Sequence, residues 1–307
     1  MRAIIYIPDI ECDSCTKVIS KRLQNKEGVH NYELKQDHLI INYDESKIKV
    51  QDIIQLIKEA GFRASLNPFE RKALKERWKD FNQNQHKYEI EIKGIQYALA
   101  IFFVLTFIEV IGYLTNFKNI PNFIQIYGMW LFYLNLSISS LGFALWHFFS
   151  YKTKITCMTG MMIGMTFGMQ TGMMLGAIIG ATNGFFIGAM TGMFLGVSVG
   201  IITGKCCGIM GIMEGMMAGL MGGTMGPMIT LMMLSDNLVW FMPFYIIVNM
   251  IILLGLSYML YEEVVENRTD IRRQPVSFSV FALLSVFTVL VLIYIMLYAP
   301  KSAAIVQ

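Results

Sequence analysis

The stretch Met158-Thr-Gly-Met-Met-Ile-Gly-Met-Thr-Phe-Gly-Met169 decides most of the fold. It opens a run of thirteen glycines spaced four residues apart, from Gly160 to Gly208. Residues i and i+4 lie on the same face of a helix, so this spacing produces helix faces without side chains. Such faces let helix backbones approach closely inside a membrane. The stretch therefore predicts tightly packed membrane helices.

Methionines fill the gaps between these glycines, and 18 of the 24 in the chain lie between Met158 and Met233. Their thioethers are uncharged, soft metal ligands that suit Cu(I) or Ag(I) and disfavour Zn²⁺, Mg²⁺ and Ca²⁺. Two methionine stripes on different helices would line one path for a metal ion across the bilayer. The alternative is that they only fill gaps in packing. The candidate ligands are Met158, Met161, Met162, Met165, Met169 and Met173, with Met213, Met217, Met221, Met225 and Met228.

The composition agrees with a membrane protein, since 55% of the 307 residues are hydrophobic and only 15% are charged. Residues 1–93 are polar, whereas residues 94–300 form an all-α membrane domain with its Met/Gly-rich core at 156–234. A net charge of +3 is too small to suggest nucleic acid, and no such partner is expected. We expect about seven transmembrane helices: Gly94–Phe117, Phe123–Phe149, Thr156–Gly180, Asn183–Thr203, Cys206–Leu234, Leu238–Tyr261 and Phe278–Tyr298.

Positive charges fall mainly on one side of these helices, at 71–93, 152–154, 205 and 268–273. The positive-inside rule therefore predicts a cytoplasmic N-terminus and an external C-terminus in a plasma or cell membrane. No signal peptide is expected at the start. All five cysteines would then face the reducing cytosol. Cys157, Cys206 and Cys207 would form a thiolate cluster at the inner mouth, unless they serve only in packing.

Residues 1–67 predict a small α+β domain. Strands are expected at Ala3–Ile7, Val29–Lys35, Leu39–Tyr43 and Phe62–Leu66, and helices at Cys15–Gln24 and Val50–Ala60. Gly61 is placed to end the second helix. The order βαββαβ is the ferredoxin-like split βαβ arrangement. Residues 68–93 are expected to connect this domain to the membrane, with a basic amphipathic helix at Phe69–Phe81 that either lies on the membrane surface or is a solvated linker.

Residues 1–67 resemble the heavy-metal-associated domain of copper chaperones and of P-type ATPase N-termini. The resemblance rests on the motif Cys12-Asp-Ser-Cys15 and on Ile57-Lys-Glu-Ala-Gly61-Phe62. It implies that Cys12 and Cys15 bind one Cu(I) through two thiolates. Ile10 departs from the family, which usually has methionine there. A redox pair or two structural cysteines are the alternatives.

The methionine region is similar to the CTR copper transporters, which combine MxxxM with GxxxG. That resemblance is limited to these short motifs and implies an analogous mechanism. Of the acidic residues within the predicted helices, Glu109 and Glu214, we expect Glu214 to attract a cation or carry a proton.

The sequence favours a transporter or channel for Cu(I) rather than an enzyme. It contains neither a Walker A lysine motif nor an Asp-Lys-Thr-Gly phosphorylation motif, so an ATP-driven pump is not expected. Passive import with delivery to the N-terminal thiolates is the main hypothesis. The alternatives are a Hg(II) importer, suggested by the adjacent Cys206 and Cys207, a proton-coupled exporter, and a membrane copper store or sensor. Expected partners are the lipid bilayer, the copper ion and a cytosolic copper chaperone or acceptor. The glycine faces would pack either within one bundle or against further copies of the chain.

Overall fold

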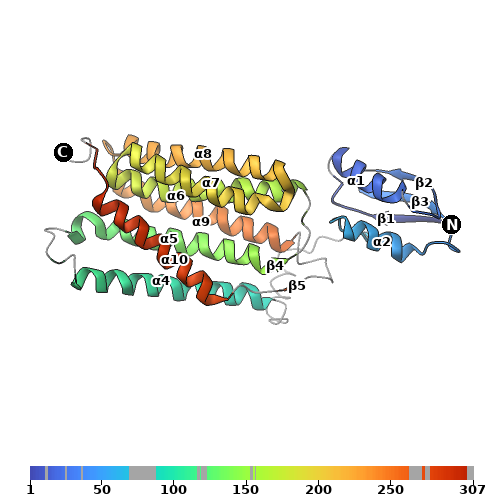
Figure 1. Ribbon diagram of the computed structural model, residues 1–307, viewed down its shortest axis with the longest axis horizontal. Coiled ribbons are helices and arrows are strands. Elements are labelled where there is room, and N and C mark those ends of the chain that lie inside the picture. Colours follow the sequence, from blue (N-terminus) through green and yellow to red (C-terminus); the bar gives the residue numbers. More distant parts are fainter. Residues whose placement is uncertain are drawn as a thin grey trace. The chain divides into compact units, whose positions relative to one another are not determined.

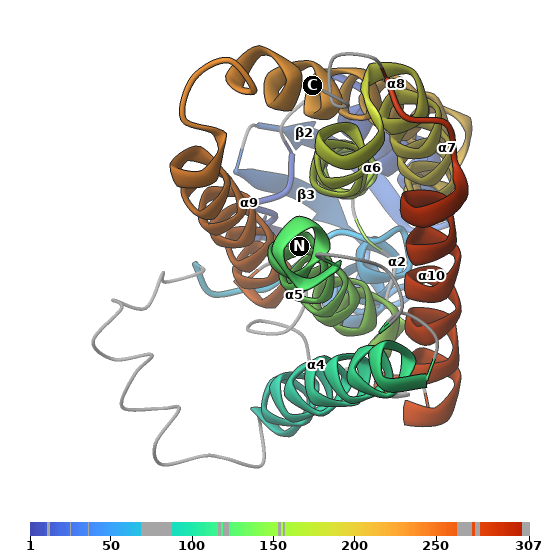
Figure 2. The same cartoon turned by 90° about the vertical axis from the view of Figure 1, so that its left-hand side faces the viewer.

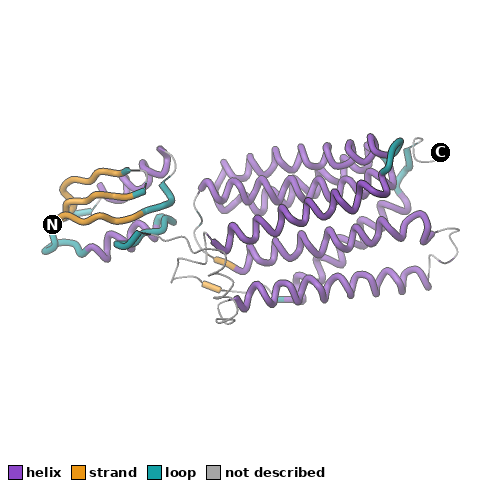
Figure 3. The backbone as a smooth tube through the Cα atoms, turned by 180° about the vertical axis from the view of Figure 1, so that it is seen from behind, coloured by secondary structure: helices purple, strands orange, loops and turns teal. Residues whose placement is uncertain are grey.

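The structure, a computed structural model, describes residues 1–10, 13–24, 26–35, 37–68, 88–115, 118, 123–152, 155, 157–262, 272–273 and 277–302. The chain divides into two compact units, an N-terminal unit with a β-sheet and a helical unit. Figure 3 shows the strands confined to the first unit apart from one short pair in the second. The predicted helix at Phe69–Phe81 lies outside the described residues.

The N-terminal unit contains a three-stranded antiparallel sheet in the order β1-β3-β2. Its elements are β1 (Arg2–Tyr6), α1 (Asp13–Gln24), β2 (Val29–Leu34), β3 (His38–Tyr43) and α2 (Val50–Glu59). Alternate strand residues such as Ile5, Leu39 and Ile41 are fully buried, because successive side chains of a strand point to opposite faces. Ile53 and Ile57 of α2 cover this apolar face, which makes a self-contained core.

The fourth strand expected at Phe62–Leu66 is reduced to one bridge, in which Tyr6 and Ser65 exchange two backbone hydrogen bonds. The cause lies two residues earlier, where the backbone N–H of Arg63 donates to the Asp9 side chain at 2.7 Å instead of to a strand. Gly61 ends α2 as expected and adopts a φ of 100°, a conformation that favours glycine.

The described residues of the helical unit form seven long helices and one short strand pair. The helices are α4 (Glu89–Thr115), α5 (Phe123–Ser150), α6 (Cys157–Asn183), α7 (Phe185–Gly204), α8 (Gly208–Met233), α9 (Leu238–Leu260) and α10 (Phe278–Tyr298); the strands are β4 (Tyr151–Lys152) and β5 (Arg272–Arg273). Figure 1 shows most of these helices running side by side along the unit.

Within the part of the chain that the structure describes, six helical stretches are long and apolar enough to cross a membrane. One of them, Phe185–Met233, has 49 residues and contains α7, the 3-10 turn η3 (Lys205–Cys207) and α8. Six such stretches fit an integral membrane protein. Seven crossings and the orientation of the termini stay predictions. The first helix begins at Glu89 rather than Gly94, so it includes the end of the predicted connector.

Helices α6, α7 and α8 gather into one bundle, while α4 lies at the opposite edge of the unit (Figures 1 and 2). Helices α6 and α8 run parallel, since Gly160 lies beside Cys206 and Gly180 lies beside Thr230. Helix α7 runs antiparallel to both. The bundle therefore brings the start of α6 and the turn before α8 to the same end.

Candidate metal-binding sites

The predicted metal loop of the N-terminal unit is only partly described. Cys15 lies in α1 and is 7% exposed, within the hydrophobic core. Cys12 lies outside the described residues, so the pairing of the two cysteines stays a prediction. Ile10, where the heavy-metal-associated family usually has methionine, is buried in the same core.

A partly buried ion pair holds the chain just before the Cys12-x-x-Cys15 motif. The Arg63 guanidinium donates to Asp9 Oδ1 from Nε at 2.9 Å and from Nη2 at 2.6 Å. With the backbone bond to Asp9 Oδ2, three donors from one residue satisfy one carboxylate. Asp9 is three residues before Cys12, so this pair fixes the start of the loop to the segment after α2. Sequence reasoning missed it because no local motif links residues 54 positions apart.

Glycines fill the centre of the α6–α7–α8 bundle. A Cβ atom on Gly200 would lie 2.2 Å from the backbone oxygen of Gly215, and one on Gly172 would lie 2.5 Å from the backbone nitrogen of Gly223. Carbon atoms pack favourably at about 3.5–4.0 Å, so these backbones are already in contact. These glycine faces pack against one another within one chain, which is one of the two arrangements that the sequence left open; assembly of copies stays a prediction. The bundle centre has no room for an ion.

The methionines lie on the outside of this bundle. The sequence left open which helix faces would line the predicted path, and the structure turns many of these side chains away from the glycine-packed centre. The reason is that close backbone contact takes the glycine faces inward, leaving longer side chains outside. The exposed methionines of α6 and α8 are Met158, Met162 and Met165 of α6 and Met210, Met213, Met216, Met217, Met221, Met225, Met228 and Met232 of α8; α7 adds one exposed methionine, Met190. Met161, Met169 and Met173 are half-buried. We call the eleven exposed methionines of α6 and α8 the methionine face.

The methionine face differs chemically from the rest of the helical surface. On α6 and α8, the exposed large apolar side chains are all methionine except Ile209 and Leu220. On α4, α5, α9 and α10, helices described throughout, the exposed large apolar side chains include no methionine. Contact with lipid requires only apolarity, which Leu, Ile, Val and Phe supply on those helices. The exposed methionine sulfur of the helical unit is therefore concentrated on α6 and α8, with Met190 on α7.

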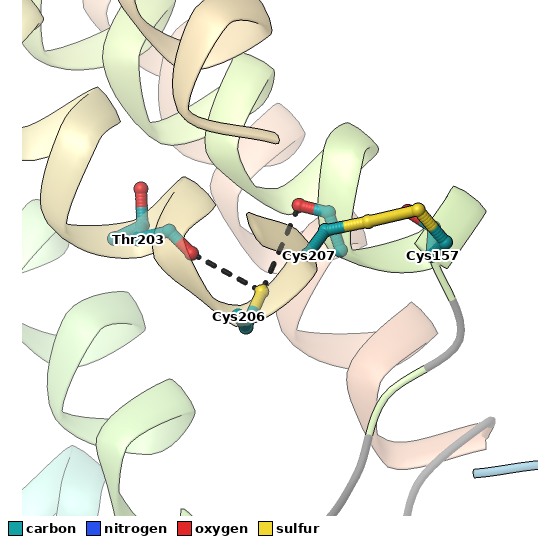
Figure 4. Close-up of a disulfide and its surroundings, with 5 residues drawn as sticks. Cys157, Thr203, Cys206 and Cys207 are labelled. Atoms are coloured by element: carbon teal, nitrogen blue, oxygen red, sulfur yellow. Dashed lines mark hydrogen bonds between the residues drawn. A yellow bond between two sulfur atoms is a disulfide. The ribbon is translucent and has the colours of Figure 1, made fainter. Parts of the chain in front are cut away.

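The three cysteines of the helical unit meet at the end of the bundle, as Figure 4 shows. Cys157 and Cys207 form a disulfide, and their Cα atoms are 5.0 Å apart. Cys206 is free and exposed, with its Sγ 3.3 Å from the carbonyl oxygen of Thr203. The expected cluster of three thiolates is corrected to one disulfide and one thiol. The parallel course of α6 and α8 explains it, because it brings two cysteines into bonding distance.

Polar groups of the helical unit are paired in ways that the sequence did not predict. Glu91 Oε1 accepts a hydrogen bond from the Tyr151 hydroxyl at 2.6 Å and lies 3.5 Å from Nε2 of the buried His147. Glu109 Oε2 accepts a bond from Asn135 Nδ2 at 2.8 Å. Glu214, the expected cation or proton site, is half-buried on α8. Among the described residues, no group of three or more His, Cys, Asp or Glu side chains could hold a metal ion.

A model of the heavy-metal-associated domain family matches residues 4–63. This supports the predicted N-terminal domain and implies heavy-metal binding by that part of the chain. The match covers about a fifth of the chain and does not extend to the helical unit. No curated protein and no solved structure matches the chain.

Proposed function

We propose that the protein carries Cu(I) across a membrane and delivers it to the thiolates of its own N-terminal domain. The observation that carries this proposal is the methionine face, which exposes eleven thioethers on two membrane-length helices in a chain with a heavy-metal-associated domain. Thioethers bind a monovalent soft ion without adding charge to the membrane, where charge is costly.

The glycine-filled centre requires the route to run along the outer surface of α8 and α6. A neighbouring copy of the chain would enclose this surface and contribute a second set of thioethers. At the cysteine end, Cys206 offers a free thiol, and reduction of the Cys157–Cys207 disulfide would add two more. Thiolates bind Cu(I) more tightly than thioethers, so the ion would pass from weaker to stronger ligands.

Import needs no other source of energy under this proposal. A membrane potential that is negative inside favours entry of a monovalent cation by about 2.3 kcal/mol per 100 mV. Thiolates on the inner side hold the ion after entry.

The test is Cu(I) uptake into proteoliposomes by the variant Met213→Leu/Met217→Leu/Met221→Leu. Leucine keeps these exposed positions apolar and removes only the sulfur, so we expect uptake to fall severalfold. The matched control replaces the buried Met174, Met242 and Met296 by leucine, which also removes three sulfurs but none from the face. Equal uptake by the two variants would show that the methionine face does not conduct the metal.

The other functions give different results in the same assay. Uptake of Hg(II) that requires Cys206 and is unaffected by the three methionine-to-leucine substitutions would identify a mercury importer. Outward movement that depends on a proton gradient would identify an exporter. Several bound Cu(I) ions without net flux would identify a store, which the lack of an interior path favours among the alternatives. Ag(I) and Zn(II) run in parallel report the selectivity for soft ions.

A further inference from the structure

The pair of Glu109 on α4 and Asn135 on α5 contains two buried acceptor atoms without a donor. Asn135 is 1% exposed, and its Nδ2 donates to Glu109 Oε2 at 2.8 Å. Glu109 Oε1 and Asn135 Oδ1 are both buried and have no hydrogen-bond partner. Buried acceptors without a donor are costly and rare in folded proteins. The two atoms belong to side chains that are already joined.

Both helices are long and apolar enough to span a membrane, and the pair lies within their length. At a rise of about 1.5 Å per residue, Glu109 lies roughly 9 Å before the end of α4 and Asn135 roughly 18 Å after the start of α5. An ionised carboxylate in such a place requires a compensating positive charge.

The packing helices supply no such charge. Helix α4 packs mainly against α5 and α10, and neither contains Asp, Glu, Lys or Arg. His147 of α5 is about 18 Å along the helix from Asn135 and faces Glu91 instead. The remaining titratable groups of these two helices are tyrosines, and they carry no positive charge: Tyr127, Tyr133, Tyr294 and Tyr298. Lys301, which follows α10, donates to the Tyr127 hydroxyl.

We propose that Glu109 and Asn135 form a proton-binding site within the membrane unit, and that Glu109 carries the proton in this structure. A proton on Oε1 turns that atom into a donor and supplies the donor that Asn135 Oδ1 lacks. A carboxylic acid and a primary amide can then form two hydrogen bonds, one in each direction. One proton thus satisfies both orphan acceptors and removes the uncompensated charge.

Infrared spectroscopy of the full-length protein in lipid tests this site at neutral pH, because a protonated carboxyl group has a carbonyl stretch separate from that of a carboxylate. We expect this absorption in the wild type and its loss in Glu109→Gln, whose amide mimics the neutral acid. Glu33→Gln, which removes an exposed carboxylate of the N-terminal domain, should keep it. Raising the pH should replace the band by a carboxylate band in the wild type and in Glu33→Gln.

Asn135→Leu provides a second test of the proton site if Glu109→Gln does not fold. It removes the bonds to the carboxyl group, so the carbonyl band should persist at a shifted frequency. The proposal would be overturned by an absent band in the wild type, by a band that survives Glu109→Gln, or by an unshifted band in Asn135→Leu. If Glu109 is ionised and a bound water supplies the missing donor, the wild type will lack the band. The measurement involves no metal, so its outcome is independent of Cu(I) transport.

Discussion

The variant Gly223→Ala tests the close backbone packing on which the position of the methionine face depends. A Cβ atom at this position would lie 2.2 Å from the backbone nitrogen of Met193 and 2.5 Å from its Cα atom. Both atoms belong to the backbone of α7, so no side chain can rotate away. Relief requires α7 and α8 to separate by roughly 1 Å at this level, since carbon contacts are favourable at about 3.5–4.0 Å.

Overpacking of this kind typically costs about 1–3 kcal/mol. We therefore expect Gly223→Ala to lower the midpoint of thermal unfolding in detergent by several degrees, at about 2–4 °C for each kcal/mol. The matched control is Gly255→Ala on α9, where an added Cβ meets nothing within 4 Å. Alanine favours a helix over glycine by up to about 1 kcal/mol, so the control should be neutral or slightly stabilised. Equal midpoints for both variants would refute the packing argument.

Three further predictions concern the ion pair and Cys15 of the N-terminal unit and the cysteines of the helical unit. Arg63→Ala leaves the partly buried Asp9 carboxylate without its guanidinium partner but keeps the backbone N–H donor, and we expect a loss of about 1–3 kcal/mol in the stability of the N-terminal unit, measured by urea unfolding; a loss below about 0.5 kcal/mol would contradict the role of this pair. Cys15→Ser should remove high-affinity Cu(I) binding in competition with a chelator, whereas unchanged affinity would place the metal elsewhere. Without a reductant, iodoacetamide should label Cys206 and spare Cys157, and labelling of both would show that the disulfide is absent.

The positions of the helices could be predicted from the sequence to within a few residues, because long apolar runs end at polar or charged turns. The predicted helix Phe278–Tyr298 coincides with α10, and Leu238–Tyr261 ends one residue after α9. The N-terminal domain was predictable from strand alternation and from a motif that the family model also detects. These features are local, and a short window of sequence contains them.

The pairs that hold the helical unit together are not local. Tyr151 and Glu91 are 60 residues apart, Glu109 and Asn135 are 26 apart, and the Cys157–Cys207 bond closes 50 residues. Each pair depends on which helices become neighbours and in which register. No periodicity within one helix specifies that register.

The orientation of the methionines follows from their offset from the glycines on the same helix, since the glycine stripe and the methionine stripe both repeat every four residues. In α6 the methionines at 161, 165, 169 and 173 each follow a glycine directly, so they lie about 100° around the helix from the glycine face. In α8 those at 213, 217, 221 and 225 come two residues after a glycine, which places them about 200° away, on the opposite side. Close packing of the glycines therefore directs the α8 methionines fully outward and leaves those of α6 at the flank. The exposed fractions agree, since Met213 and Met217 are 57% and 61% exposed while Met169 and Met173 are half-buried. Any site that uses this sulfur must accordingly be centred on the outer side of α8.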